Sequence, residues 1–219
     1  MSTTEIEISS PSSLINRRLS RNFTLGEFLR SETAERRDDL WQAQLAIPQE
    51  CIANLAYLTT TVLQEIRDTF RYPITISSGY RSPELNKAVG GSATSQHCSG
   101  QAADIQIADA FLIDPRYEPL RQRIRERVRY HTGRSMREDC NANYYLFAFV
   151  CLRMRYLDID QVIHEYGDGF GKPAWVHVSA SPGPSAKGQI LVYGRYWQEP
   201  KHSVDLAEAM RFGVSEFYA

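Results

Sequence analysis

The sequence predicts an α+β fold in which helices flank a small, mostly antiparallel sheet. Three observations support this class. Apolar residues recur at helical spacing in the first third of the chain, short alternating runs typical of strands follow, and Gly/Pro turns separate the last three of those runs. The 219 residues, 42% hydrophobic and 23% charged, are enough for one domain with a core of its own.

The N-terminal third is predicted to be helical after a short leader. Residues 1–21 are polar and lack apolar periodicity, so we expect a flexible leader. Thr24 and Glu27 have the spacing of a capping box, which predicts a short helix. Residues 47–70 then place apolar side chains along one stripe, the clearest helical pattern in the chain.

Strands and further helices are predicted in the middle of the chain. Ile74 and Ile76 alternate with polar neighbours, and residues 103–108 alternate in the same way, as half-buried strands do. Residues 115–133 predict a charged helix whose arginines we interpret as a solvated face rather than a site for an anionic polymer. The apolar run at 143–157 is long enough to favour a buried helix.

The last third predicts three strands, DQVIHEYG, AWVHVSAS and QILVYGRY, joined by Gly/Pro turns into an antiparallel meander. A helix is expected to end the chain. These patterns give a flexible leader at 1–21, one domain at 22–200 with a helical insertion at 108–157, and a C-terminal helix at 201–219.

Composition excludes several classes of function. A net charge of −1 gives no global basic excess for nucleic acid, and no run approaches the roughly 18 apolar residues of a membrane span. The four cysteines form no C-x-x-C pair, so we expect free, packed thiols. The N-terminus lacks the pattern of a secretory signal, which predicts synthesis in the cytoplasm.

One His and one Asp stand close together in SQHCSGQAADI, separated mainly by small residues. Gly100 permits a tight turn, so that His97 on a loop and Asp104 on the following strand can reach a common point. His177 stands on the polar face of a later strand, where a lone His is more commonly structural. Two imidazoles and one carboxylate together suit a catalytic zinc ion, because they leave a fourth position for water.

The segment SGYRSPELNKAVGGSATSQHCSGQAADI resembles the signature of the zinc D-Ala-D-Ala carboxypeptidase and peptidoglycan-peptidase family, whose fold is shared with Hedgehog domains. DQVIHEYG and WVHVSASPG match its downstream segments in order. FTLGEFLRSETA is similar to the branch that includes phage lysis enzymes. The resemblance spans about residues 22–106 and 159–194, and it implies a Hedgehog-like fold with one zinc ion on the sheet.

The resemblance also implies roles for particular residues. His97, Asp104 and His177 fall on the family's zinc ligands. Arg81 falls on an arginine that contacts the substrate carbonyl or the developing oxyanion. Ala174 stands where several branches carry the catalytic acid.

The general base therefore has to lie elsewhere. The most similar branch has a Glu on the preceding strand, which Glu165 matches, and Asp168 and Asp160 remain alternatives.

Other residues near the ligands are expected to bind the peptide. Ser95 and Gln96 flank the first ligand, and Trp175 shares a strand face with His177. With Arg81 they form the predicted substrate-binding set, although Ser95 and Gln96 alternatively only shape their loop. The remaining strand histidine, His164, should point to the opposite face and be structural.

The sequence thus predicts a zinc-dependent peptidase that hydrolyses stem peptides of bacterial peptidoglycan, as a D-Ala-D-Ala carboxypeptidase or a cell-wall endopeptidase of endolysin type. The alternative is a non-catalytic, zinc-containing module that binds cell wall or forms part of a virion. We expect the enzyme to reach the wall after release or injection, as a phage protein or an effector, because a secretory signal is missing.

Overall fold

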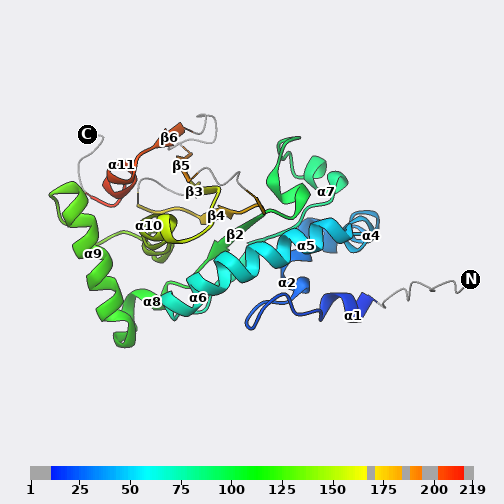
Figure 1. The fold of residues 1–219 in the computed structure, drawn as a ribbon, viewed down its shortest axis with the longest axis horizontal. Helices are drawn as coiled ribbons and strands as arrows, with labels where there is room; N and C mark the ends of the chain where they lie inside the picture. Colours follow the sequence, from blue (N-terminus) through cyan, green and yellow to red (C-terminus); the bar gives the residue numbers. More distant parts are fainter. Residues whose placement is uncertain (1–10, 167–170, 184–187, 194–201, 215–219) are drawn as a thin grey trace, which may run out of the picture.

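The computed structural model describes residues 11–166, 171–183, 188–193 and 202–214. Within these ranges one sheet of six strands has the order β1-β2-β4-β3-β5-β6. The strands are β1 Thr75–Ser78, β2 Ala102–Gln106, β3 Gln161–Glu165, β4 Trp175–Ser179, β5 Gln189–Val192 and β6 His202–Val204. Only the pair of β3 and β5 is parallel among these strands, which confirms the predicted α+β class (Figure 1).

Outside this sheet, most of the described structure is helical. They are α1 Pro11–Ile15, α2 Leu25–Leu29, α3 Glu32–Glu35, α4 Asp38–Leu45, α5 Gln49–Leu58, η1 Thr59–Leu63, α6 Gln64–Phe70, α7 Pro83–Ala88, η2 Gln96–Ser99, α8 Ala110–Ile113, η3 Pro115–Tyr117, α9 Glu118–Thr132, α10 Ala142–Arg153, η4 Met154–Tyr156 and α11 Leu206–Arg211. None of the helices within the described ranges has the length and apolar character needed to cross a membrane.

The second half of the predicted leader is ordered, which corrects the expectation of a flexible segment over residues 1–21. Residues 11–15 form α1, and Leu19 is buried in the main core. Gly26 on α2 approaches Ile15 so closely that a Cβ there would lie 2.4 Å from its side chain. A polar composition did not indicate this packing, because a few apolar contacts are sufficient to order a short segment on a larger surface.

The capping box predicted for the first short helix is present. The backbone amide of Thr24 donates to Glu27 Oε2 at 2.6 Å at the start of α2.

The predicted long helix is also present, but it contains a π-helical turn. After α5, three consecutive threonines begin η1, and their hydroxyls donate to carbonyls four residues earlier. Such back-bonding competes with the regular helical ladder and commonly bends helices.

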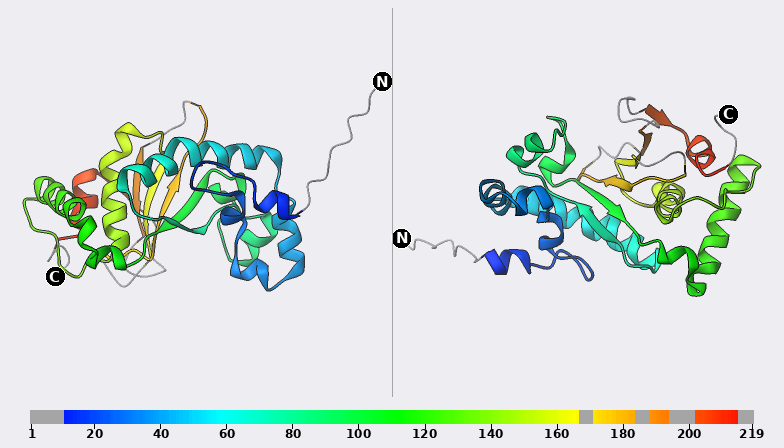
Figure 2. Two further views of the ribbon diagram at one scale, coloured as in Figure 1. Left: turned by 90° about the horizontal axis from the view of Figure 1, so that it is seen from below. Right: turned by 180° about the vertical axis from the view of Figure 1, so that it is seen from behind.

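One face of the sheet packs in the core, and the other carries the candidate site residues. Ala103, Ile105, Val162, Val176 and Val178 belong to one buried cluster together with apolar residues of α5, α6 and α10. Successive strand residues point to opposite faces, so Asp104, His177 and Glu165 stand on the other face. The helices therefore hold one face of the sheet in place while the other face is available for chemistry (Figure 2).

The predicted antiparallel meander of the last three strands is wrong for its third member. β3 and β4 pair antiparallel, but β5 crosses to the far edge of β3 and pairs with it in parallel. The second edge of β4 is already occupied by β2. This arrangement leaves β4 between β2 and β3, the two strands that carry the other candidate site residues.

The range 108–157 is helical, as predicted, and its status as an insertion remains a prediction. α10 is not peripheral, since Tyr144, Leu146, Phe147 and Val150 are fully buried in the main core. Within the predicted C-terminal helix at 201–219, the structure instead has β6 followed by the shorter α11. All four cysteines are free thiols, as expected.

Gly100 ends η2 in the left-handed conformation, with φ of 68°, and a Cβ there would lie 2.4 Å from the Cys51 carbonyl oxygen. Gly133 ends α9 with φ of 71° but has open space around it. We expect Gly100→Ala to lower the free energy of unfolding by about 2–4 kcal/mol, because backbone strain and a clash add together. Gly133→Ala should lower it by about 1 kcal/mol from strain alone. Urea titration of both variants checks this, and equal losses would contradict it.

Candidate metal centre and active site

Asp104 and His177 are brought together by strand pairing. β2 and β4 run antiparallel in a register that sets Asp104 directly opposite His177. Side chains of such a cross-strand pair share one face with Cβ atoms about 4.5–5.5 Å apart. His177 Nδ1 consequently lies 3.0 Å from Asp104 Oδ1.

His97 reaches the same point from η2, the short helix before β2. Its Nδ1 lies 2.6 Å from the Gly79 carbonyl oxygen and donates to it, because that oxygen can only accept. This bond fixes the ring and leaves Nε2 directed at the other two side chains. Gly79 is needed there, since a Cβ at this position would lie 2.5 Å from the Phe28 backbone.

Three donor atoms converge in this way at one buried place. His97 Nε2 is 3.2 Å from His177 Nδ1 and 3.3 Å from Asp104 Oδ1, and the third side of the triangle is the 3.0 Å contact already described. All three side chains are buried, with side-chain exposures of 3–8%. Lone pairs that face one another so closely require a cation or a shared proton between them.

The dimensions of the triangle fit one zinc ion. Tetrahedral zinc with bonds of about 2.0–2.2 Å to His nitrogen and carboxylate oxygen separates its ligand atoms by about 3.4 Å. Among the described residues, His97, Asp104 and His177 form a group of side chains that could hold a metal ion. His177 Nε2, on the far side of its ring, is buried and has no partner within the described residues.

The pKa shifts of His97 and Asp104 also suit a metal, which needs neutral imidazole and ionised carboxylate. Burial lowers the pKa of His97, although the neighbouring Asp104 carboxylate opposes this shift. Burial would raise the pKa of Asp104, but the charge of His97 and hydrogen bonds from His177 and His97 outweigh it, so the net direction is downward.

Arg81 lies beside the cluster and contacts the outer oxygen of Asp104. Its Nη2 donates to Asp104 Oδ2 at 3.0 Å, and its Nε donates to Ser78 Oγ at 2.9 Å. Within the described residues Nη1 makes no hydrogen bond, and the half-buried side chain lines the cavity described below. Arg81 is thus fixed on one side and retains N–H donors for a ligand.

Glu165 and Trp175 form the next cross-strand pair along β4. They stand opposite each other in the β3–β4 ladder, and the Trp175 indole donates to Glu165 Oε2 at 2.7 Å. Trp175 and His177 share a face of β4, so Glu165 stands diagonally across from His177. The indole holds the carboxylate on the face that carries the three donor atoms.

A cavity of about 780 Å³ opens over this face. Its lining includes His97, His177, Arg81, Glu165, Trp175, Ser95 and Gln96. The backbones of Ser95 and Gln96 bond within η2 and to Gln101, so they do shape the loop. Their side chains also face the cavity, and a role in binding substrate remains a prediction.

The alternative bases lie elsewhere. Asp160 precedes β3 at the end opposite Glu165, where its Oδ2 accepts a 2.6 Å bond from Ser181, and it does not line the cavity. Asp168 lies outside the described residues. Glu165 is the predicted candidate that the structure places over the donor triangle.

Two contacts of the site were missed by sequence reasoning, the Gly79 carbonyl that orients His97 and the Ser78 hydroxyl that accepts from Arg81. Both residues stand in the segment SGYRS, next to Arg81, so the motif contained the signal. The pairing of Trp175 with Glu165 was missed as well, because the two residues are ten positions apart on different strands.

A comparison with known protein families matches part of the chain. A model of the Peptidase M15 family matches residues 22–139, a range that includes Arg81, His97 and Asp104. Glu165, Trp175 and His177 lie beyond the match, and strand pairing is what joins them to the matched part. No curated protein sequence matches the chain.

His164 points to the opposite face, as expected, and packs against Phe147, Tyr144 and Phe212. Burial without a hydrogen-bond partner in the described residues lowers its pKa to about 3, whereas an unfolded His titrates near 6.5. The unfolded chain therefore binds the extra proton between these values, and stability is lost as the pH falls through this window.

We expect His164→Phe to flatten this acid loss by up to about 1.4 kcal/mol per pH unit between pH 6.5 and 3, because the variant has no proton to take up. Urea titrations at several pH values measure the slope. His131→Gln, a change at a half-exposed His, is the control and should flatten it much less. Parallel pH profiles for wild type and His164→Phe would contradict the assignment.

Proposed function

Because the chain belongs to the peptidase M15 family, whose members are zinc-dependent peptidases, we propose that it hydrolyses peptide bonds in the stem peptides of bacterial peptidoglycan. The observation that carries the proposal is the convergence of His97 Nε2, Asp104 Oδ1 and His177 Nδ1 within 3.0–3.3 Å of one another. Three protein ligands leave a fourth position open, as in catalytic rather than structural zinc sites.

His97, Asp104 and His177 would hold the zinc ion. Zinc at such a site acts as a Lewis acid and lowers the pKa of water to about 7. Asp104 has a divided role in this arrangement, since Oδ1 faces the two imidazoles while Oδ2 accepts from Arg81. The guanidinium holds the carboxylate in place without competing for the oxygen that faces the two imidazoles.

Glu165 is the proposed general base. Its carboxylate lies on the same face of the sheet and on the strand next to His177, where it can take a proton from water and later pass it to the leaving amine. The Trp175 indole donates to Oε2 and holds the carboxylate in this position. Proton transfer by a placed carboxylate typically contributes about 10²–10⁴-fold to the rate.

Arg81 is the proposed oxyanion donor. Two of its donor groups are bound to Asp104 and Ser78, which fixes the plane of the guanidinium beside the donor triangle. A fixed donor aimed at a developing negative charge is typically worth about 3–4 kcal/mol. The part of Arg81 that lines the cavity would be available to a substrate carbonyl bound there.

The proposal predicts separate losses on substitution. Wild type loaded with zinc should release peptide fragments from purified sacculi, and Glu165→Gln should keep the metal while losing activity by about 10²-fold or more. His97→Ala and His177→Ala should lose both metal and activity, since each removes one of three ligands. Metal content and mass spectrometry of the fragments measure the two effects.

His164→Phe is the matched control for the histidine variants, because it alters a buried His on the other face of the sheet. The fragments also identify the bond, since loss of a terminal D-Ala indicates a carboxypeptidase and separation of cross-linked stems indicates an endopeptidase. Zinc-loaded wild type that binds sacculi and cuts nothing would support the non-catalytic wall-binding module instead.

A substitution at Trp175 tests whether its indole holds the Glu165 carboxylate in position. Trp175→Phe keeps an aromatic ring but removes the indole donor, so we expect kcat to fall by roughly tenfold with little change in KM. If Trp175 acts mainly by stacking on substrate, KM rises instead and kcat is retained. Trp41→Phe, at a half-buried position outside the cavity lining, is the control and should change neither constant.

A further inference from the structure

The solvent side of α9 carries positive charge that the site does not use. Residues 116–134 hold seven arginines, no lysine and two glutamates, a formal charge of +5 in a chain whose net charge is −1. The helix is fixed to the body by one stripe, because Arg121, Ile124 and Val128 are buried. The side away from this stripe faces solvent at the end of the molecule.

Six of the seven arginines of this segment, all except Arg134, fall into two groups. Arg116, Arg121 and Arg125 are paired with Asp114 or Glu118. Arg123, Arg127 and Arg129 are exposed, and no carboxylate within the described residues pairs with them. Glu126 also faces solvent and accepts a hydrogen bond from the Gln122 amide.

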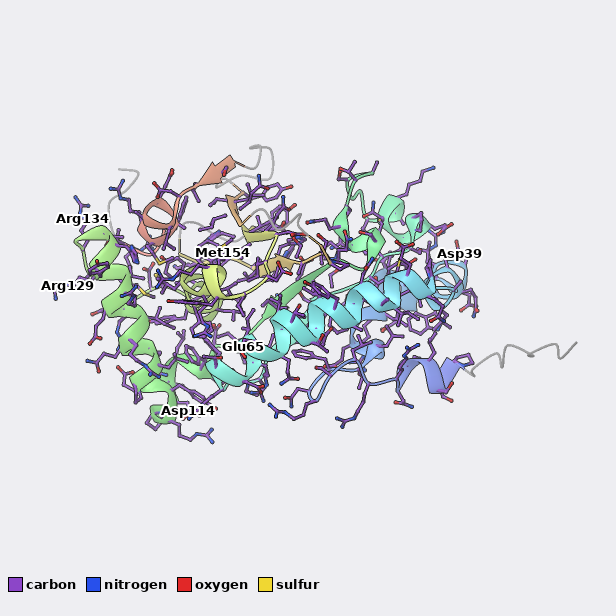
Figure 3. All side chains as sticks on the ribbon, in the orientation of Figure 1. Asp39, Glu65, Asp114, Arg129, Arg134 and Met154 are labelled. Carbon is purple, nitrogen blue, oxygen red and sulfur yellow. The ribbon has the colours of Figure 1, made fainter. Side chains whose placement is uncertain are left out.

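Spacing along the helix gathers the second group with an aromatic ring. Arg123, Arg127 and Tyr130 follow one another at four and three residues and so lie along one side. The Arg127 guanidinium lies over the Tyr130 ring at 5.2 Å, and Tyr130 is 76% exposed. Arg129 is also exposed but stands about 200° around the helix from Arg127, on the other side of Glu126. We call these four residues the α9 basic face (Figure 3, where Arg129 is labelled).

Stability alone does not account for this arrangement. Like charges four residues apart on a helix repel and destabilise it, and Arg123 and Arg127 form such a pair. An exposed tyrosine adds apolar surface that no other described element covers. A bound polyanion would neutralise the repulsion, and arginine presents a planar fork that matches two oxygens of a phosphate.

We propose that the α9 basic face binds a linear polymer with repeating phosphate groups that is attached to the bacterial cell wall. The choice of a wall polymer rests on the proposed function, which places the substrate in the same wall. A lipid surface fits less well, because Ile124 and Val128 of α9 are buried and its exposed face offers arginines, Glu126 and one tyrosine. Nucleic acid shares the phosphate chemistry and is treated as a competing outcome.

The position of the face suits an anchor. α9 lies at the end of the molecule opposite α4 and α7, and residues of α7 and the loop after it line the cavity (Figures 1 and 2). A polymer bound at α9 therefore leaves the cavity open to peptide. Binding there would hold the protein at the wall between cleavage events and raise the local concentration of substrate.

The test is co-sedimentation of the full chain with sacculi that carry phosphodiester-linked polymers, compared with the same sacculi after hydrofluoric acid has removed those polymers. The Glu165→Gln background prevents digestion. The triple variant Arg123→Gln, Arg127→Gln and Arg129→Gln should bind untreated sacculi about tenfold or more weakly, with a salt dependence reduced by about one unit of slope per lost phosphate contact.

A second triple variant, Arg17→Gln, Arg36→Gln and Arg155→Gln, loses the same charge at exposed positions on other elements and should bind as the parent does. Equal loss in both triple variants, or equal binding of the parent to treated and untreated sacculi, would overturn the proposal. Tighter binding of the parent to duplex DNA than to untreated sacculi would overturn it in favour of nucleic acid.

Failure of this proposal and failure of the proposed function give different results. Hydrolysis of a small soluble stem peptide depends on the cavity, so the α9 triple variant should cleave it at the rate of wild type. Loss of sacculus binding with intact peptide cleavage supports the anchor alone. Intact, salt-sensitive binding in a protein that cleaves no peptide leaves the anchor standing and removes the peptidase.

Discussion

The register of β2 against β4 is the constraint on which the rest of the site depends. It sets Asp104 opposite His177, and the turn at Gly100 then returns His97 to the same point. Three atoms with lone pairs are held within 3.3 Å of one another by buried side chains, two of which line the cavity. Such a cluster is unfavourable on its own, so the surrounding fold must impose it, and a cation or a shared proton between the three atoms would offset their repulsion.

The alternation of the strands separates stability from chemistry. His164 and Glu165 are neighbours on β3. His164 packs against aromatic rings of α10 and against Phe212, which follows α11, whereas Glu165 lines the cavity. The same division holds on β4, where Val176 and Val178 pack in the core and Trp175 and His177 form the site. Substitutions on one face can therefore change stability with little effect on the other.

The outer contacts of the cluster have a common effect, which is to fix one atom by occupying another. The Gly79 carbonyl oxygen accepts a hydrogen bond from His97 Nδ1 and so directs Nε2 toward Asp104 and His177. Arg81 donates to Oδ2 of Asp104, so that Oδ1 faces the imidazoles. Trp175 donates to one oxygen of Glu165. The donors are thereby pre-organised before any ligand arrives, which lowers the cost of binding and of reaching the transition state.

The sequence by itself determined the α+β class, most helices and strands, the face on which each strand residue stands, and the motif with His97 and Asp104. These features follow from periodicity and turn residues, which act over a few neighbouring positions. Tertiary structure alone decided that β5 pairs with β3, that residues 11–19 pack on the body, and that Trp175 and Arg81 bind site carboxylates. Such choices depend on which edges and surfaces remain free after distant segments have packed, and no local pattern carries that information.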